Sequence, residues 1–79
     1  MENMKERVSA VLVQVNKKAE LHLDSTSLVS SGILDSLDIM SLIMDLEREF
    51  EIEIDPEDLL SENFESVDAI TGLVEKCRS

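Results

Sequence analysis

The sequence is poor in the residues from which metal and catalytic sites are built. Its 79 residues include one cysteine, one histidine, two phenylalanines and neither tryptophan nor tyrosine. The single cysteine, Cys77, cannot form an internal disulfide. A zinc site usually needs several cysteine or histidine ligands, and His22 is the only histidine. No glycine lies between Ile33 and Thr71, so the acidic segment there cannot form an EF-hand calcium loop. We therefore expect no metal site and a reducing compartment.

The shortage of glycine, proline and aromatic residues favours a helical domain. There are two glycines and one proline, and 43% of the residues are apolar, so the core must be aliphatic. No apolar run approaches the roughly 20 residues of a membrane-spanning helix, and no signal-peptide region is expected at the N-terminus. We expect a single all-α domain over residues 1–79 that is cytoplasmic, monomeric and without a membrane partner.

Basic residues are scarce as well. Seven lysines and arginines stand against 18 acidic residues, which gives a net charge of −11. Between Asp35 and Asp68 there are thirteen acidic residues and a single basic one, Arg48. This field repels nucleic acid, which we exclude as a partner, but it attracts proteins with basic surface patches. The alternative is an acidic surface that only keeps the protein soluble.

The segment from Leu37 to Phe50 carries two apolar stripes when it is placed on a helix at about 100° per residue. The wider stripe has the spacing of a core-facing helix. Its members are Ile39, Leu42, Ile43, Leu46 and Phe50. The narrower stripe, about 130° away, consists of Leu37, Met40 and Met44. We expect it to face outward as an adaptable docking surface, although a helix buried on two sides is the alternative.

The stretch Gly32-Ile33-Leu34-Asp35-Ser36-Leu37-Asp38 leads into this helix. Asp35 or Ser36 stands where an N-cap belongs, because a short polar side chain can accept a hydrogen bond from the first turn. By spacing alone, Ser36 is a cap or a first-turn residue. No histidine or lysine in this stretch could act as its base, so we expect no catalytic residues and a protein that is not an enzyme.

The triplet Asp35-Ser36-Leu37, preceded by a glycine-containing turn and followed by Asp38 and a long helix, resembles the signature of acyl carrier proteins, in particular of discrete bacterial carriers. The resemblance covers nearly the whole chain. It implies a small bundle of three main helices and one short helix, with a long first loop. It also implies that Ser36 carries a covalent 4′-phosphopantetheine arm, with Asp35 and Leu37 as motif neighbours, and that the arm holds cargo as a thioester.

The resemblance implies partners too. A phosphopantetheinyl transferase would attach the arm, and acyl-loading and acyl-processing enzymes with basic docking patches would exchange the cargo. The expected partner contacts are Asp38, Met40, Met44 and Glu47. Fatty acid and polyketide biosynthesis are the expected pathways, while an aminoacyl or D-alanyl cargo stays open. The competing hypothesis is an acidic helical adaptor without a prosthetic group, in which Ser36 is only a cap.

The spacing of apolar residues and the positions of capping residues predict the secondary structure of the other segments. A first helix is predicted over about 3–17, and a long connection follows over about 19–34. Spaced aliphatic residues predict that this connection is pinned across the bundle. They are Leu21, Leu23, Leu28, Ile33 and Leu34.

After the central helix, Ile54 is expected to point inward. Asp55 is predicted to cap a short helix over about 56–60 that begins with a proline. Ser66 is predicted to cap a last helix over about 67–77. Cys77 continues the apolar stripe of that helix, which favours burial over redox chemistry.

Overall fold

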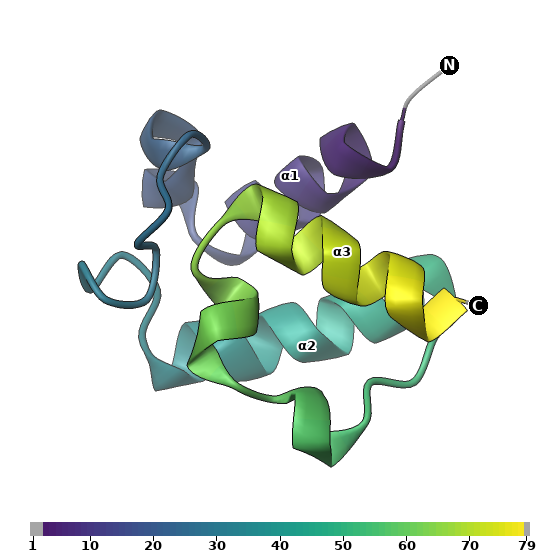
Figure 1. Ribbon diagram of the computed structural model, residues 1–79. Coiled ribbons are helices and arrows are strands. Elements are labelled where there is room, and N and C mark those ends of the chain that lie inside the picture. The colour runs from purple at the N-terminus through teal and green to yellow at the C-terminus, as the bar shows by residue number, and fades with distance from the viewer. Residues whose placement is uncertain (1–2, 79) are drawn as a thin grey trace.

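Three α-helices surround one core, which is aliphatic except for Phe50 and Phe64, and short 3-10 helices lie in the connections between them (Figure 1). The computed structural model describes residues 3–78, so residues 1–2 and 79 of the predicted domain lie outside it. The α-helices are α1 (Met4–Val15), α2 (Ser36–Phe50) and α3 (Val67–Arg78). The 3-10 helices are η1 (Lys17–His22), η2 (Pro56–Asp58) and η3 (Ser61–Phe64). No strand occurs within residues 3–78, and the predicted all-α class with three main helices is confirmed.

α1 begins at a side-chain cap and ends earlier than predicted. Asn3 Oδ1 accepts a hydrogen bond from the Glu6 N–H at 2.8 Å, which satisfies one free donor of the first turn. At Asn16 the backbone becomes extended, with φ −149° and ψ 109°. The Asn16 side chain then accepts from the Lys18 N–H at 2.9 Å and so begins η1. The predicted end at residue 17 is therefore wrong, because a separate helix starts there.

The connection between α1 and α2 is pinned across the bundle, as predicted. Leu28 and Leu34 are buried, and the Leu28 N–H donates to the Glu65 carbonyl at 2.8 Å. Leu21 does not contribute, since its side chain is 84% exposed. That part of the prediction is wrong because η1 turns Ala19, and not Leu21, into the core.

The chain after α2 first runs extended, and Ile54 is buried as predicted. Asp55 is the N-cap residue of η2 and Pro56 follows at the first helical position, as predicted, but the Asp55 side chain makes no capping hydrogen bond. The reason is the 3-10 geometry, in which the Asp55 carbonyl already accepts the Asp58 N–H at 2.9 Å. η2 ends at Asp58, short of the predicted residue 60, because the backbone leaves the helical region at Leu59, with φ −82° and ψ 54°.

η3 and α3 complete the core. η3, which the sequence did not predict, buries Phe64. Ser66 Oγ accepts a hydrogen bond from the Ala69 N–H at 3.0 Å, which confirms the predicted cap of α3. The buried residues of α3 are Val67, Ile70, Leu73 and Val74. Cys77 packs half-buried against the core, and this burial raises the pKa of its thiol.

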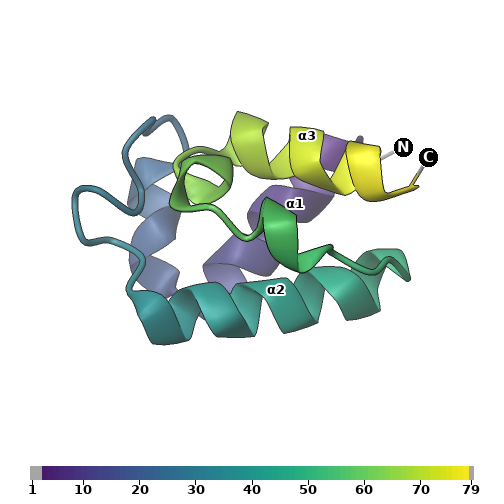
Figure 2. The same ribbon diagram turned by 60° about the horizontal axis from the view of Figure 1, so that its bottom comes forward.

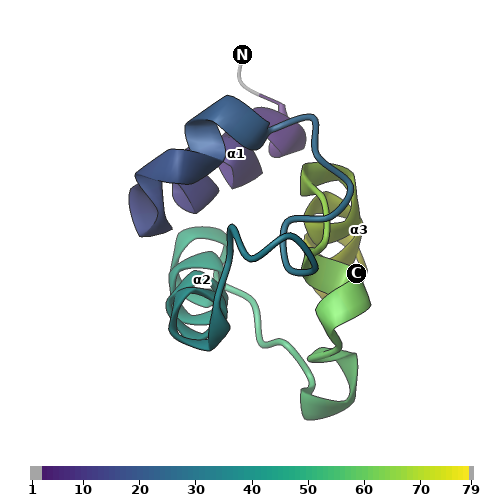
Figure 3. The same ribbon diagram turned by 90° about the vertical axis from the view of Figure 1, so that its left-hand side faces the viewer.

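The three α-helices enclose the core from different sides. α1 packs against both α2 and α3. Figure 2 shows α2 along one side of the molecule, with α1 and α3 on the other. Figure 3 shows the connection between η1 and α2 crossing one end of the bundle. Among the described residues, no helix combines the length and apolarity needed to cross a membrane.

Candidate functional site

Ser36 is the first residue of α2, and its side chain is exposed. Asp35 precedes it as N-cap, with Oδ1 accepting from the Asp38 N–H at 2.8 Å. In return, Asp38 Oδ2 accepts from the Asp35 N–H at 3.3 Å, which makes a capping box. The sequence left the cap to either Asp35 or Ser36. The structure assigns it to Asp35, so the Ser36 hydroxyl has no part in the cap.

The start of α2 suits a covalently attached anionic group. The N–H groups of a first helical turn and the positive end of the helix dipole favour negative charge there. The carboxylates of Asp35 and Asp38 lie beside this position, and each accepts a backbone N–H. These hydrogen bonds offset part of their charge. The residues present therefore fit a phosphate-containing group on the Ser36 oxygen.

The turn before Ser36 has a defined backbone. Gly32 has φ +86°, a left-handed conformation that glycine adopts without the steric cost of a side chain. Its N–H donates to the Val29 carbonyl at 3.0 Å, and the Leu34 N–H donates to the Leu28 carbonyl at 2.9 Å. Because Leu28 and Leu34 are both buried, the turn is anchored on the core.

Asn16, from the far end of α1, holds both sides of the same turn. Its Nδ2 atom donates to the Ile33 carbonyl at 2.8 Å and to Asp38 Oδ2 at 2.9 Å. No sequence pattern indicated this contact, because the partners lie 17 and 22 residues away along the chain. Asn16 thus joins the capping box of α2 to the first helix.

A second side chain, Glu65, holds the loop that precedes the turn. Its Oε1 atom accepts from the Val29 N–H at 2.8 Å and the Ser30 N–H at 3.0 Å, and its Oε2 atom accepts from the Ser30 hydroxyl. The Ser30 hydroxyl, followed by the Ser30 and Val29 N–H groups, lowers the pKa of this carboxyl group. Sequence reasoning missed Glu65 as well, since these partners are also remote along the chain.

The narrower apolar stripe of α2 lies outward, as predicted. Leu37 is 74% exposed, Met40 61% and Met44 60%, and we call these three residues the outer stripe. On the other face, Leu42, Leu46 and Phe50 are buried. The alternative of a helix buried on two sides is therefore wrong. Two of the residues predicted to contact partners, Met40 and Met44, are open to solvent.

The other two residues predicted to contact partners, Asp38 and Glu47, already make hydrogen bonds within the domain. Asp38 takes part in the capping box and binds Asn16. Glu47 Oε2 accepts from the Ile54 N–H at 3.0 Å, which ties α2 to the extended segment after it. Both side chains are half-buried, so they offer a partner less surface than the methionines do.

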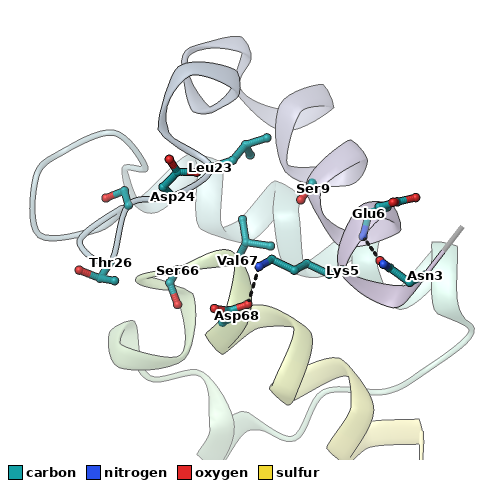
Figure 4. Close-up of a pocket in the computed structure, with 11 residues that line it drawn as sticks. Asn3, Lys5, Glu6, Ser9, Leu23, Asp24, Thr26, Ser66, Val67 and Asp68 are labelled. Carbon is teal, nitrogen blue, oxygen red and sulfur yellow. Dashed lines mark hydrogen bonds and ion pairs between the residues drawn. The ribbon is translucent and has the colours of Figure 1, made fainter.

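A groove of about 680 Å³ lies away from Ser36, between the start of α1, the loop after η1 and the start of α3 (Figure 4). Lys5 Nζ and Asp68 Oδ1 form an ion pair at 3.0 Å there. None of the predicted site residues lines it. Within residues 3–78, no group of three or more His, Cys, Asp or Glu side chains is placed to hold a metal ion.

Comparison with known proteins assigns a chemistry to this arrangement. Residues 6–74 match the family model described as "Phosphopantetheine attachment site". The acyl carrier protein of Buchnera aphidicola subsp. Baizongia pistaciae (strain Bp) is 35% identical over 77 residues, covering 96% of each chain.

Two further relatives agree. The acyl carrier protein of Buchnera aphidicola subsp. Schizaphis graminum (strain Sg) is 39% identical over 59 residues, or 73% of this chain and 75% of that protein. An "Acyl carrier protein homolog" of Mycoplasmopsis pulmonis (strain UAB CTIP) is 36% identical over 66 residues, or 84% of this chain and 88% of that protein. No solved structure matches the chain significantly.

Proposed function

The chain belongs to the acyl carrier protein family, and from this premise we propose that it carries acyl-type intermediates as thioesters on a 4′-phosphopantetheine arm attached to Ser36. The observation that supports Ser36 most directly is its place at the exposed start of α2, with the cap supplied by its neighbour Asp35. When bound, the arm supplies a terminal thiol that holds an acyl group. The protein itself is a carrier and not an enzyme, and residues 1–79 act as a single carrier domain.

Some residues of the chain position the attachment serine, and others present the surface on which partners dock. The capping box and the turn before it hold the Ser36 hydroxyl at the surface, where a modifying enzyme can reach it. Asp35 and Leu37 flank the attachment point. The outer stripe presents apolar surface beside it, and the acidic residues along α2 attract basic patches on partners.

The partners of this proposal are a phosphopantetheinyl transferase and enzymes that load and process acyl groups. They dock on Met40 and Met44, with Asp38 and Glu47 at the edge of the contact. The cargo belongs to fatty acid, polyketide or related biosynthesis. The protein works as a cytoplasmic monomer.

The competing hypothesis is an adaptor without a prosthetic group, in which Ser36 was expected to be only a cap. Asp35 makes that cap instead, through the 2.8 Å bond to the Asp38 N–H. An exposed serine in the first turn is compatible with both hypotheses, so it is the family match that favours the carrier.

Intact mass spectrometry tests the proposal. Incubation with coenzyme A and a broad-specificity transferase should add the mass of one phosphopantetheine. Ser36→Ala should remove all labelling and leave the fold intact, because the side chain is exposed and outside the cap. Ser41→Ala, at an exposed serine on the same helix, is the matched control and should label fully. An unchanged wild-type mass, under conditions that modify a known carrier, would overturn the proposal.

A further inference from the structure

We propose that Asn16 is a positioning residue for the attachment serine, which holds the turn around Ser36 in the geometry that allows its hydroxyl to be modified. The inference rests on the proposed function of Ser36. It concerns a residue at the end of α1 that touches neither the hydroxyl nor the outer stripe.

Asn16 is hydrogen-bonded in three directions. Its backbone N–H donates to the Leu12 carbonyl at 3.0 Å, and its Oδ1 atom accepts from the Lys18 N–H at 2.9 Å. Its Nδ2 atom makes the two bonds to the Ile33 carbonyl and to Asp38 Oδ2. The two bonds from Nδ2 are partly buried, whereas the bond from the Lys18 N–H is exposed to water. The residue is thus fixed on α1 and η1 by two bonds and reaches the turn by two more.

The two acceptors on the turn stand on either side of Ser36. A carbonyl oxygen and a carboxylate oxygen repel each other, and an amide group with two N–H donors lies between them. Asp38 Oδ2 also completes the capping box through the Asp35 N–H. Asn16 therefore fixes the entry to Ser36 and the carboxylate that follows it at the same time. Without this amide group, we expect the turn to open and the capping box to weaken.

Loss of the Asn16 bonds should therefore affect the modification of Ser36. Transfer of a group to a hydroxyl requires the oxygen to be held in a narrow range of positions, and small displacements lower the rate. A loosened turn should therefore lower the kcat of phosphopantetheine transfer. The KM for the carrier should change less than kcat, since Met40 and Met44 are untouched and only Asp38, at the edge of the proposed contact, loses its bond to Asn16.

Asn16→Asp separates this role from general packing. The aspartate keeps an oxygen to accept the Lys18 N–H, but it places a second oxygen against the Ile33 carbonyl and Asp38. The matched control is Asn63→Asp. Asn63 Nδ2 donates to the Asp58 carbonyl at 2.7 Å, the same kind of bond in a segment that carries neither Ser36 nor the outer stripe.

Transferase kinetics on the apo protein give the first readout. Asn16→Asp should lower kcat by about tenfold, with KM within about twofold of the wild type. Asn63→Asp should keep the kcat of the wild type. A folded Asn16→Asp protein with wild-type kcat, or with a raised KM alone, would overturn the inference. If the wild type itself is not modified, the proposed function fails and the inference fails with it.

Nuclear magnetic resonance gives a second readout, and its first measurement needs only the wild-type protein. In the wild type, the Asn16 side-chain amide protons should exchange with solvent more slowly than those of Gln14, which is exposed on the same helix. In Asn16→Asp, backbone order parameters over residues 33–37 should fall, while in Asn63→Asp they should not. Equal exchange at Asn16 and Gln14 in the wild type would overturn the inference.

Discussion

The two faces of α2 have similar apolarity and opposite surroundings. On one face, Leu42 and Leu46 are 0% exposed and Phe50 is 8% exposed. On the other, the outer stripe is between 60% and 74% exposed. The difference comes from the neighbours, because α1 and α3 both pack against α2 and together cover only one side of it. An apolar residue on this helix therefore packs in the core or stays open to solvent according to its angle around the axis.

The composition of the two faces matches their tasks. The core stripe uses isoleucine, leucine and phenylalanine, which fill a fixed space in well-defined conformations. The outer stripe uses two methionines beside one leucine, and the unbranched thioether can repack against different surfaces. The comparison shows that the apolar residues that build the core and those proposed for recognition lie on separate faces of one helix. Substitutions should then separate the two.

The largest effect is expected on the core face. Leu46→Ala should lower the free energy of unfolding by about 2–5 kcal/mol, through lost burial and the cavity left behind. Chemical denaturation followed by circular dichroism measures this change. A loss below about 1 kcal/mol would mean that the core collapses around the alanine and that the face is less tightly packed than its burial indicates.

A smaller effect, on binding and not on stability, is expected on the outer face. Met44→Lys should change the free energy of unfolding by no more than about 0.5 kcal/mol, as is common for surface changes. It should lower the kcat/KM of Ser36 modification by about tenfold, because it removes apolar surface and opposes a basic partner. Leu46→Ala, assayed well below its melting temperature, should keep most of that activity. If Met44→Lys unfolds the domain as strongly as Leu46→Ala does, the assignment of the two faces is wrong.

Salt should give the smallest effect, raising the stability of the domain while slowing its association with a basic partner. The thirteen acidic residues between Asp35 and Asp68 repel one another in the folded chain, and about 0.15 M salt screens them with a Debye length near 8 Å. The melting temperature should rise by a few degrees, since about 1 kcal/mol moves it by roughly 4–8 °C in a domain of this size. Association with the transferase should slow over the same range. A melting temperature that stays flat would show that the acidic residues are too well solvated to oppose folding.

The sequence predicted what local patterns encode. Caps at Asp35 and Ser66 place the starts of α2 and α3, and the angular spacing of apolar residues separates the two faces of α2. η1 and η3 were not predicted, because 3-10 helices this short do not show a periodic spacing of apolar residues. The roles of Asn16 and Glu65 were not predicted either, because their hydrogen bonds join segments between 17 and 36 residues apart. The turn before Ser36 could thus be located from the sequence, but the side chains that hold it in place could not.

The central claim is that Ser36 carries the prosthetic arm, and mass spectrometry of proteolytic peptides tests it most directly. After incubation with coenzyme A and transferase, the account predicts phosphopantetheine on the peptide that contains Ser36, with fragment ions placing it on that side chain. Ser41, exposed on the same helix, should be unmodified. Phosphopantetheine on Ser41 or on another serine, with Ser36 unmodified, would contradict the account.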